Sequence, residues 1–194
     1  MTRHFGKALS LLLLSAFIFI AGCNDSDPVP ANENELITTL KLTFRMREHD
    51  GTPVDADPVT FTWRDADGPG PGAPMADEIH LEANATYALE LQVLDESKNP
   101  VEDISAEIRE EDEEHQFFFV ISGVDAAVVY DDEDGNGNPV GLTSVVETGA
   151  AGAGSLNVIL RHELNKSGAG VRSGNPANAG GETDLDVTFD VTIQ

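Results

Sequence analysis

The chain has 194 residues, of which 35 are acidic and 11 are lysine or arginine, so its formal net charge is −24. Such a surface repels nucleic acid and anionic lipid headgroups, and we expect neither as a partner. The length suits one domain of ordinary size, and regularly spaced apolar residues argue against disorder over most of it.

The N-terminus has the three-part layout of a secretory signal. Basic residues are followed by an apolar run over residues 8–20 and then by an Ile-Ala-Gly-Cys sequence that ends at Cys23. The run is shorter than the about 20 residues that a membrane-spanning helix needs, and its flanks fit a cleaved signal. The last four residues resemble a lipobox, in which the cysteine carries the lipid. We predict a signal peptide over residues 1–22 and lipidation of Cys23. The alternative is an ordinary cleaved signal with a chance cysteine.

Cys23 is the only cysteine in the sequence. No disulfide can form within the chain, although an exported protein would meet an oxidising environment. We therefore assign the thiol to lipid anchoring. Residues 23–35 are predicted to form a tether and residues 36–194 a single domain. Asn24 is not the aspartate associated with retention in the inner membrane, so we expect an envelope protein anchored in the outer membrane.

Apolar residues at alternate positions dominate the domain and predict half-buried β-strands. Clear alternation occurs in four segments: 40–46, 59–63, 87–93 and 184–193. Further strand candidates are 117–121, 126–130, 142–146 and 156–164. About eight short strands predict an all-β, immunoglobulin-like sandwich. Residues 168–183 are rich in glycine and asparagine and lack this pattern, so we predict a loop there.

One acidic segment departs from strand spacing. Between residues 100 and 114, the apolar residues Val101, Ile104 and Ile108 follow helical spacing. Asp103 or Ser105 is suited to cap such a helix, and acidic residues in its first turn complement the helix dipole. We predict a short acidic helix at one end of the sandwich.

Three residues next to this segment are candidate metal ligands. If the helix reaches His115, then Glu111 and His115 share one helix face. If a strand begins there, His115 falls in phase with Phe117, and His162 likewise continues the inward-facing set of its own strand. The two histidines would then meet at one rim of the sandwich. Imidazole with carboxylate suits zinc or copper. The alternative is a pair of hydrogen-bonded rim histidines beside a solvated acidic surface.

A second candidate is the acidic loop that contains Asp132, Asp134 and Asn136. These residues occupy positions 1, 3 and 5 of an EF-hand-like loop, whose oxygen ligands suit calcium. However, the position of the bidentate glutamate is taken by Thr143, and strands rather than helices flank the loop. A plain hairpin turn is the alternative, since Asp-Gly and Asn-Gly sequences favour such turns.

Three stretches together resemble a family of small uncharacterised bacterial lipoproteins. They are NELITTL at 34–40, EEHQFF at 113–118 and GGETDLDV at 180–187. That family is sometimes labelled as having a type 1 periplasmic binding fold, and the resemblance implies an association with TonB-dependent outer-membrane receptors. A periplasmic binding fold needs alternating strands and helices in two lobes, which conflicts with a strand-rich chain. We therefore retain the sandwich prediction.

The sequence contains no recognisable catalytic motif. A nucleophile elbow, a P-loop, a zinc-protease helix and a dinucleotide fingerprint are all missing from it, so we predict that the chain is not an enzyme. We expect a ligand- or partner-binding lipoprotein, with a divalent metal bound on behalf of an outer-membrane uptake receptor. The alternative is a structural or adhesion module with no small ligand.

Overall fold

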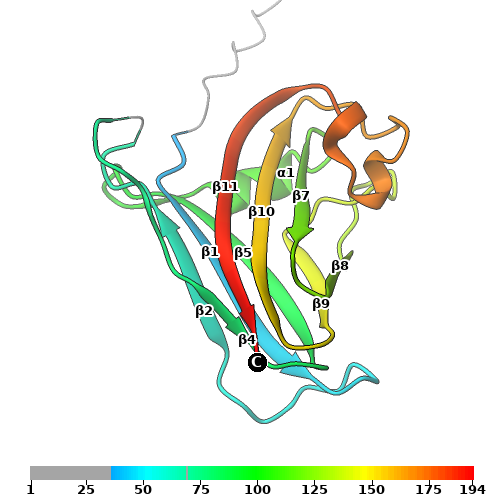
Figure 1. Cartoon of the computed structure of the whole chain (residues 1–194). Coiled ribbons are helices and arrows are strands. Elements are labelled where there is room, and N and C mark those ends of the chain that lie inside the picture. Colours follow the sequence, from blue (N-terminus) through cyan, green and yellow to red (C-terminus); the bar gives the residue numbers. More distant parts are fainter. Residues whose placement is uncertain (1–35, 69) are drawn as a thin grey trace, which may run out of the picture. The chain divides into compact units, whose positions relative to one another are not determined.

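The structure, a computed structural model, describes residues 36–68 and 70–194 (Figure 1). Cys23, the predicted signal and the predicted tether lie outside the described residues. Within the described part of the chain, no helix has the length and apolar character needed to cross a membrane.

Eleven strands and one α-helix make up the described domain, together with two short 3₁₀ turns. In chain order they are β1 (Thr39–Arg47), β2 (Val59–Arg64), β3 (Met75–Ala76), β4 (Ile79–Leu81), β5 (Thr86–Asp95), β6 (Glu102–Asp103), α1 (Ile104–Glu110), β7 (His115–Ser122), β8 (Ala126–Tyr130), β9 (Thr143–Thr148), β10 (Gly152–His162), η1 (Val171–Ser173), η2 (Pro176–Asn178) and β11 (Glu182–Ile193).

The strands form two sheets that share one apolar core. The larger sheet has the order β3-β2-β1-β5-β9-β8, with β6 paired to the end of β5. The smaller sheet has the order β4-β11-β10-β7. All of these pairings are antiparallel except that of β4 with β11. β7 and β8 follow each other in the chain but belong to different sheets, at the same open side of the sandwich (Figure 1).

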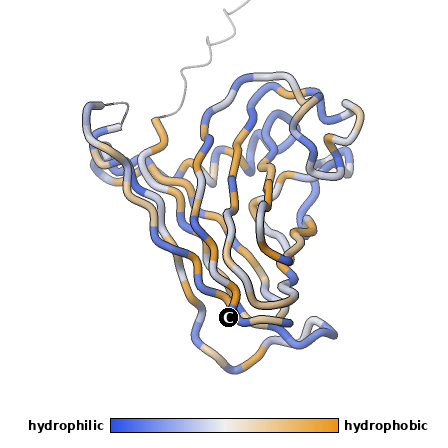
Figure 2. The backbone as a smooth tube through the Cα atoms, in the orientation of Figure 1, coloured by the Kyte–Doolittle hydropathy of each residue, from blue (hydrophilic) through white to orange (hydrophobic). Residues whose placement is uncertain are grey.

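Alternate residues of each long strand face this core, because successive side chains point to opposite faces of a sheet. In β11, for example, every second residue from Leu185 to Ile193 is buried while Asp186, Thr188 and Asp190 are exposed. The same alternation is visible along the strands in Figure 2. The prediction of an all-β sandwich is confirmed, and all eight predicted strands are present. The immunoglobulin-like strand order stays a prediction.

Three strands are additional to the eight expected from the sequence. β3, β4 and β6 have only two or three residues each, too few to show a period of two. They extend existing sheets through backbone pairing, and this pairing leaves little trace in the side-chain pattern. Short edge strands are also a common way to end a sheet.

The acidic helix is shorter than the predicted span of residues 100–114. α1 covers only Ile104–Glu110, because Glu102 and Asp103 pair with β5 and Asp103 then caps the helix by accepting from the backbone N–H of Ser105. Beyond Glu110, four further acidic residues would crowd the negative end of the helix dipole. The helix ends there, and Ile104 and Ile108 pack into the core.

The glycine-rich segment 168–183 has more structure than the sequence predicted. It contains η1 and η2, and it buries Val171 and Ala179 against Phe118 and Ile159. This small second cluster lies on the outer face of the smaller sheet, because Phe118 and Ile159 alternate with residues of the main core. Two isolated apolar residues have no periodicity, so sequence reasoning missed their contribution.

Candidate metal centre

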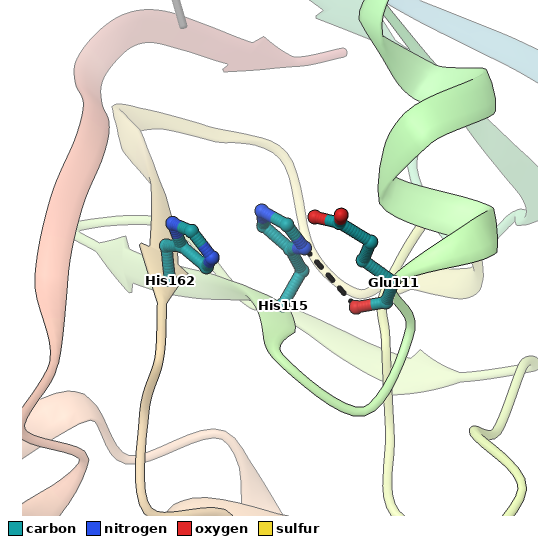
Figure 3. A group of neighbouring side chains, drawn as sticks. All are labelled: Glu111, His115 and His162. Atoms are coloured by element: carbon teal, nitrogen blue, oxygen red, sulfur yellow. Dashed lines mark hydrogen bonds between the residues drawn. The ribbon is translucent and has the colours of Figure 1, made fainter. Parts of the chain in front are cut away.

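Two strand ends bring His115 and His162 together. β7 begins at His115, β10 ends at His162, and the antiparallel register pairs the two residues directly. Both therefore face the same side of the smaller sheet as Phe117 and Leu160, each of which lies two residues away along its strand. The imidazole rings are stacked, with centroids 4.3 Å apart and planes inclined by 7° (Figure 3). The sequence prediction that the two histidines meet at a rim agrees with this placement.

Glu111, the third predicted ligand, approaches from the end of α1. It is the C-cap residue of the helix, and its backbone carbonyl accepts a hydrogen bond from His115 Nδ1 at 3.1 Å. A carbonyl oxygen can only accept, so Nδ1 carries the proton. The neutral ring then presents a lone pair at Nε2. A histidine held in this way through its other nitrogen is the usual arrangement in metal sites.

His115 Nε2 is buried and has no hydrogen-bond partner among the described residues. Only 1% of His115 is exposed to solvent. An unpartnered buried acceptor destabilises a fold by about 1–3 kcal/mol, so such atoms are uncommon. Burial, followed by the neighbouring His162, lowers the pKa of His115 from its ordinary value of 6.5, although the carbonyl of Glu111 acts in the opposite direction. Burial therefore favours the neutral, metal-binding form of the ring.

The three side chains form a set of potential ligands that we call the inner cluster: Glu111, His115 and His162. One ligand atom of each lies within 4.8 Å of those of the other two. Bonds of 2.0–2.1 Å to a tetrahedral zinc ion require separations of about 3.3 Å. The lone pairs of stacked rings lie in nearly parallel planes and cannot converge on one point, so one ring must rotate before both can bind a single ion. Figure 3 shows the Glu111 carboxylate beside the His115 ring.

A second set of ligands, the outer cluster, consists of Glu114, His162 and Glu163. Glu114 Oε2 lies 3.5 Å from His162 Nε2. The sequence placed Glu114 within the acidic run but did not single it out, and it gave no signal for Glu163. Neighbouring residues of a strand point to opposite faces, so Glu163 should face away from His162. It does not, because its φ of 50° reverses the chain at the end of β10.

Asp184 is a further polar residue near the histidines that the sequence did not reveal. It is half-buried on β11, next to the point where the register between β10 and β11 shifts at Leu160 and Arg161. Its Oδ1 atom is buried without a partner among the described residues. Burial raises the pKa of Asp184, and the two histidines partly offset this effect. The carboxylate therefore lies within electrostatic range of both rings.

The predicted calcium loop uses its carboxylates differently. Asp132 accepts hydrogen bonds from the backbone N–H groups of Gly141 and Thr143. Asp134 accepts from the backbone of Asn136 and Asn138. Its Oδ2 lies 3.1 Å from the ammonium group of Lys166. Asp132 and Asp134 thus bind groups of the protein itself, and an ammonium cation lies where Asp134 would contribute to a calcium site. Calcium binding by Asp132, Asp134 and Asn136 stays a prediction.

Comparison with known protein families, with curated proteins and with solved structures finds no match to this chain.

Proposed function

We propose that this protein is a lipid-anchored envelope protein that binds a divalent transition-metal ion, zinc or copper, at the inner cluster. The observation that carries the proposal is the buried His115–His162 pair, in which the Nε2 lone pair of His115 meets no donor among the described residues. Two imidazoles and a carboxylate form the donor set that borderline metals prefer over calcium or magnesium. A cation is also the species that would satisfy several neighbouring acceptors at once.

The proposed role is to hold the ion for an outer-membrane uptake receptor of the TonB-dependent class, or for another envelope protein. Support comes from the signal and lipobox that end at Cys23 and from the acidic composition of the chain. A strongly acidic protein raises the local concentration of cations by electrostatic attraction. No catalytic step is assigned to the site, because the residues around it form a ligand set rather than a nucleophile with its base.

Metal content of the full-length protein, purified in detergent, tests this function. After treatment with a chelator, the protein is equilibrated separately with zinc, copper and calcium and freed of unbound ion. We expect one zinc or copper ion per chain for the native protein and a large loss for His115→Ala and His162→Ala. His80→Ala is the matched control, since His80 also lies beside a glutamate, with 3.8 Å between His80 Nε2 and Glu78 Oε2, but is exposed on β4. Native protein that holds far less than one ion per chain would contradict the proposal.

The lipid anchor is tested separately. Bacteria that express the full chain are labelled with a radioactive fatty acid, and their membranes are fractionated. Label is expected in the native protein and in the outer-membrane fraction, and Cys23→Ala should abolish both. Labelled Cys23→Ala protein would contradict the assignment of this residue.

A structural or adhesion module is the second candidate function, and a surface cleft favours it. The cleft has a volume of about 440 Å³ and lies between β7, β8 and η1, with Phe119, Tyr130 and Arg172 in its lining. Aromatic residues and arginine are the side chains that protein interfaces favour. This function predicts crosslinking to an envelope protein on whole cells that Arg172→Glu abolishes and that the metal does not affect.

A further inference from the structure

The inner and outer clusters share one residue, His162. The inner cluster adds Glu111 and His115 to it, and the outer cluster adds Glu114 and Glu163. In each cluster the potential ligand atoms lie within 4.8 Å of one another. The two clusters are therefore adjacent ligand sets that compete for the same imidazole.

In both clusters the histidines are far less exposed than the carboxylates. The side chain of Glu114 is 59% exposed and that of His162 is 10% exposed. Glu111 and Glu163 are also exposed, whereas His115 is 1% exposed. An ion from solution meets the carboxylates first, and the outer cluster offers two of them where the inner cluster offers one. It meets His162 next and His115 last.

We infer that the outer cluster is the entry site for the inner cluster: it takes a divalent ion from solution and passes it inward through His162. The inference rests on the proposed metal-binding function and adds the route by which the buried ligands are loaded. Carboxylates can hold an ion that still keeps several of its water ligands. His162 is placed to remain bound to the ion while Glu111 and His115 replace those waters. The bonds to Glu114 and Glu163 are replaced in turn by bonds to His115 and Glu111, and the shared imidazole keeps the ion bound to the protein throughout.

The direction of transfer follows from what each cluster lacks. The outer carboxylates are exposed and have water to satisfy them. In the inner cluster, His115 Nε2 is a buried acceptor with no hydrogen-bond partner among the described residues. A cation at the inner cluster removes this unfavourable arrangement, and solvent screens its interactions less there. The ion is therefore held more tightly at the inner cluster.

The backbone around Glu163 keeps the outer cluster in place. Glu163 has a φ of 50°, and the chain of the next strand passes close to it at Gly181, which has a φ of 68°. A Cβ atom at position 181 would overlap the carbonyl oxygen of His162 and touch the backbone of Glu163. Glycine at this position allows β11 to lie directly against the turn that presents Glu163 beside His162.

Loading of the full-length, metal-free protein with cobalt(II) tests the route. Cobalt absorbs weakly in an oxygen-rich, six-coordinate site and strongly in a four-coordinate site with nitrogen ligands, so rapid-mixing absorption follows the ion inward. We expect a weak early signal that converts to a strong one. The double variant Glu114→Gln, Glu163→Gln should reach the same final spectrum with an association rate about tenfold lower. Glu90→Gln, Glu147→Gln removes the same charge from exposed positions of the larger sheet and should change the rate less than twofold.

Two results would overturn the route while leaving metal binding intact. One is an unchanged association rate in the Glu114→Gln, Glu163→Gln variant. The other is loss of the strong final spectrum in that variant, since the outer carboxylates would then be ligands of the resting site. Failure of the native protein to bind cobalt or zinc at all would instead remove the proposed function together with the route. Far-ultraviolet circular dichroism confirms that each variant is folded, and Glu114→Gln alone serves as a second, milder variant.

Discussion

Two regions of this protein differ in how their buried polar groups are satisfied. Around Asp134, the chain supplies its own cation: the side chain of Lys166 is buried, and its Nζ lies 3.1 Å from the carboxylate and also donates to the Pro139 carbonyl oxygen. At the inner cluster, His115 Nε2 is a buried acceptor that has no hydrogen-bond partner among the described residues. The comparison teaches that an acidic loop with calcium-like spacing can be internally neutralised, while a pair of histidines without any such motif holds the unpartnered acceptor.

The largest expected effect comes from removing the internal cation. Lys166→Met leaves the Asp134 carboxylate buried without its partner, and we expect the free energy of unfolding to fall by about 3–5 kcal/mol. Urea denaturation measures this change. Lys98→Met, at an exposed position, is the control and should change stability by less than about 0.5 kcal/mol. The double variant Lys166→Met, Asp134→Asn should recover most of the loss, and equal loss in both variants would contradict the pairing.

The second prediction concerns the backbone that supports the histidine pair. Gly181→Ala introduces a Cβ atom that overlaps the His162 carbonyl oxygen, at a residue with positive φ. We expect a loss of about 3 kcal/mol in the free energy of unfolding and weaker zinc binding. Gly180→Ala also has a positive φ, but its Cβ atom would meet nothing within 4 Å, so about 1 kcal/mol is expected. Equal losses in the two variants would show that the close approach at position 181 does not matter.

The third prediction uses zinc to separate the two regions. At a free zinc concentration of one hundred times the dissociation constant, the free energy of unfolding should rise by about 2.7 kcal/mol. The rise should disappear in His162→Ala and persist in Lys166→Met, which alters only the other region. Calcium should produce no comparable rise in the native protein, because Lys166 already neutralises Asp134. Thermal denaturation at matched ion concentrations makes the comparison.

The smallest effect is an acid-dependent one at Asp134. Burial would raise the pKa of Asp134, but hydrogen bonds from Asn138 and Lys166 outweigh it, so the pKa lies below its ordinary value of 3.8. Because the folded protein binds the proton less readily, this contribution to stability is present above pH 3.8 and is lost as the pH falls through the lowered pKa. Between pH 5 and 2, the native protein should lose more stability than Lys166→Met, Asp134→Asn. Parallel curves would contradict the prediction.

Much of the sandwich could be predicted because its strands bury one face each. The period-two pattern of β11, from Leu185 to Ile193, fixes both the presence of a strand and the face that meets the core. The same reasoning placed His115 and His162 on core-facing phases at strand ends. The two histidines could meet only if their strands were neighbours. β7 and β10 are neighbours in the smaller sheet.

The features that sequence reasoning missed depend on contacts between distant segments or on single backbone angles. Lys166 follows β10 and reaches Asp134 in the loop between β8 and β9, and no spacing rule links the two residues. Glu163 joins the outer cluster because one positive φ reverses the side that it would face in a regular strand. Asp184 comes near the histidines because the register shifts at Leu160 and Arg161. These are tertiary features, and composition and periodicity carry no information about them.

The cross-strand pairing of His115 with His162 has a consequence for the order of events in the life of the chain. β8 and β9 separate the two histidines in sequence, yet they belong to the opposite sheet. The chain must cross to the larger sheet and return before the two rings can stack. A polypeptide that has not closed its sandwich has no paired imidazoles to offer an ion. Stacking of the two rings therefore marks a domain whose two sheets have both formed.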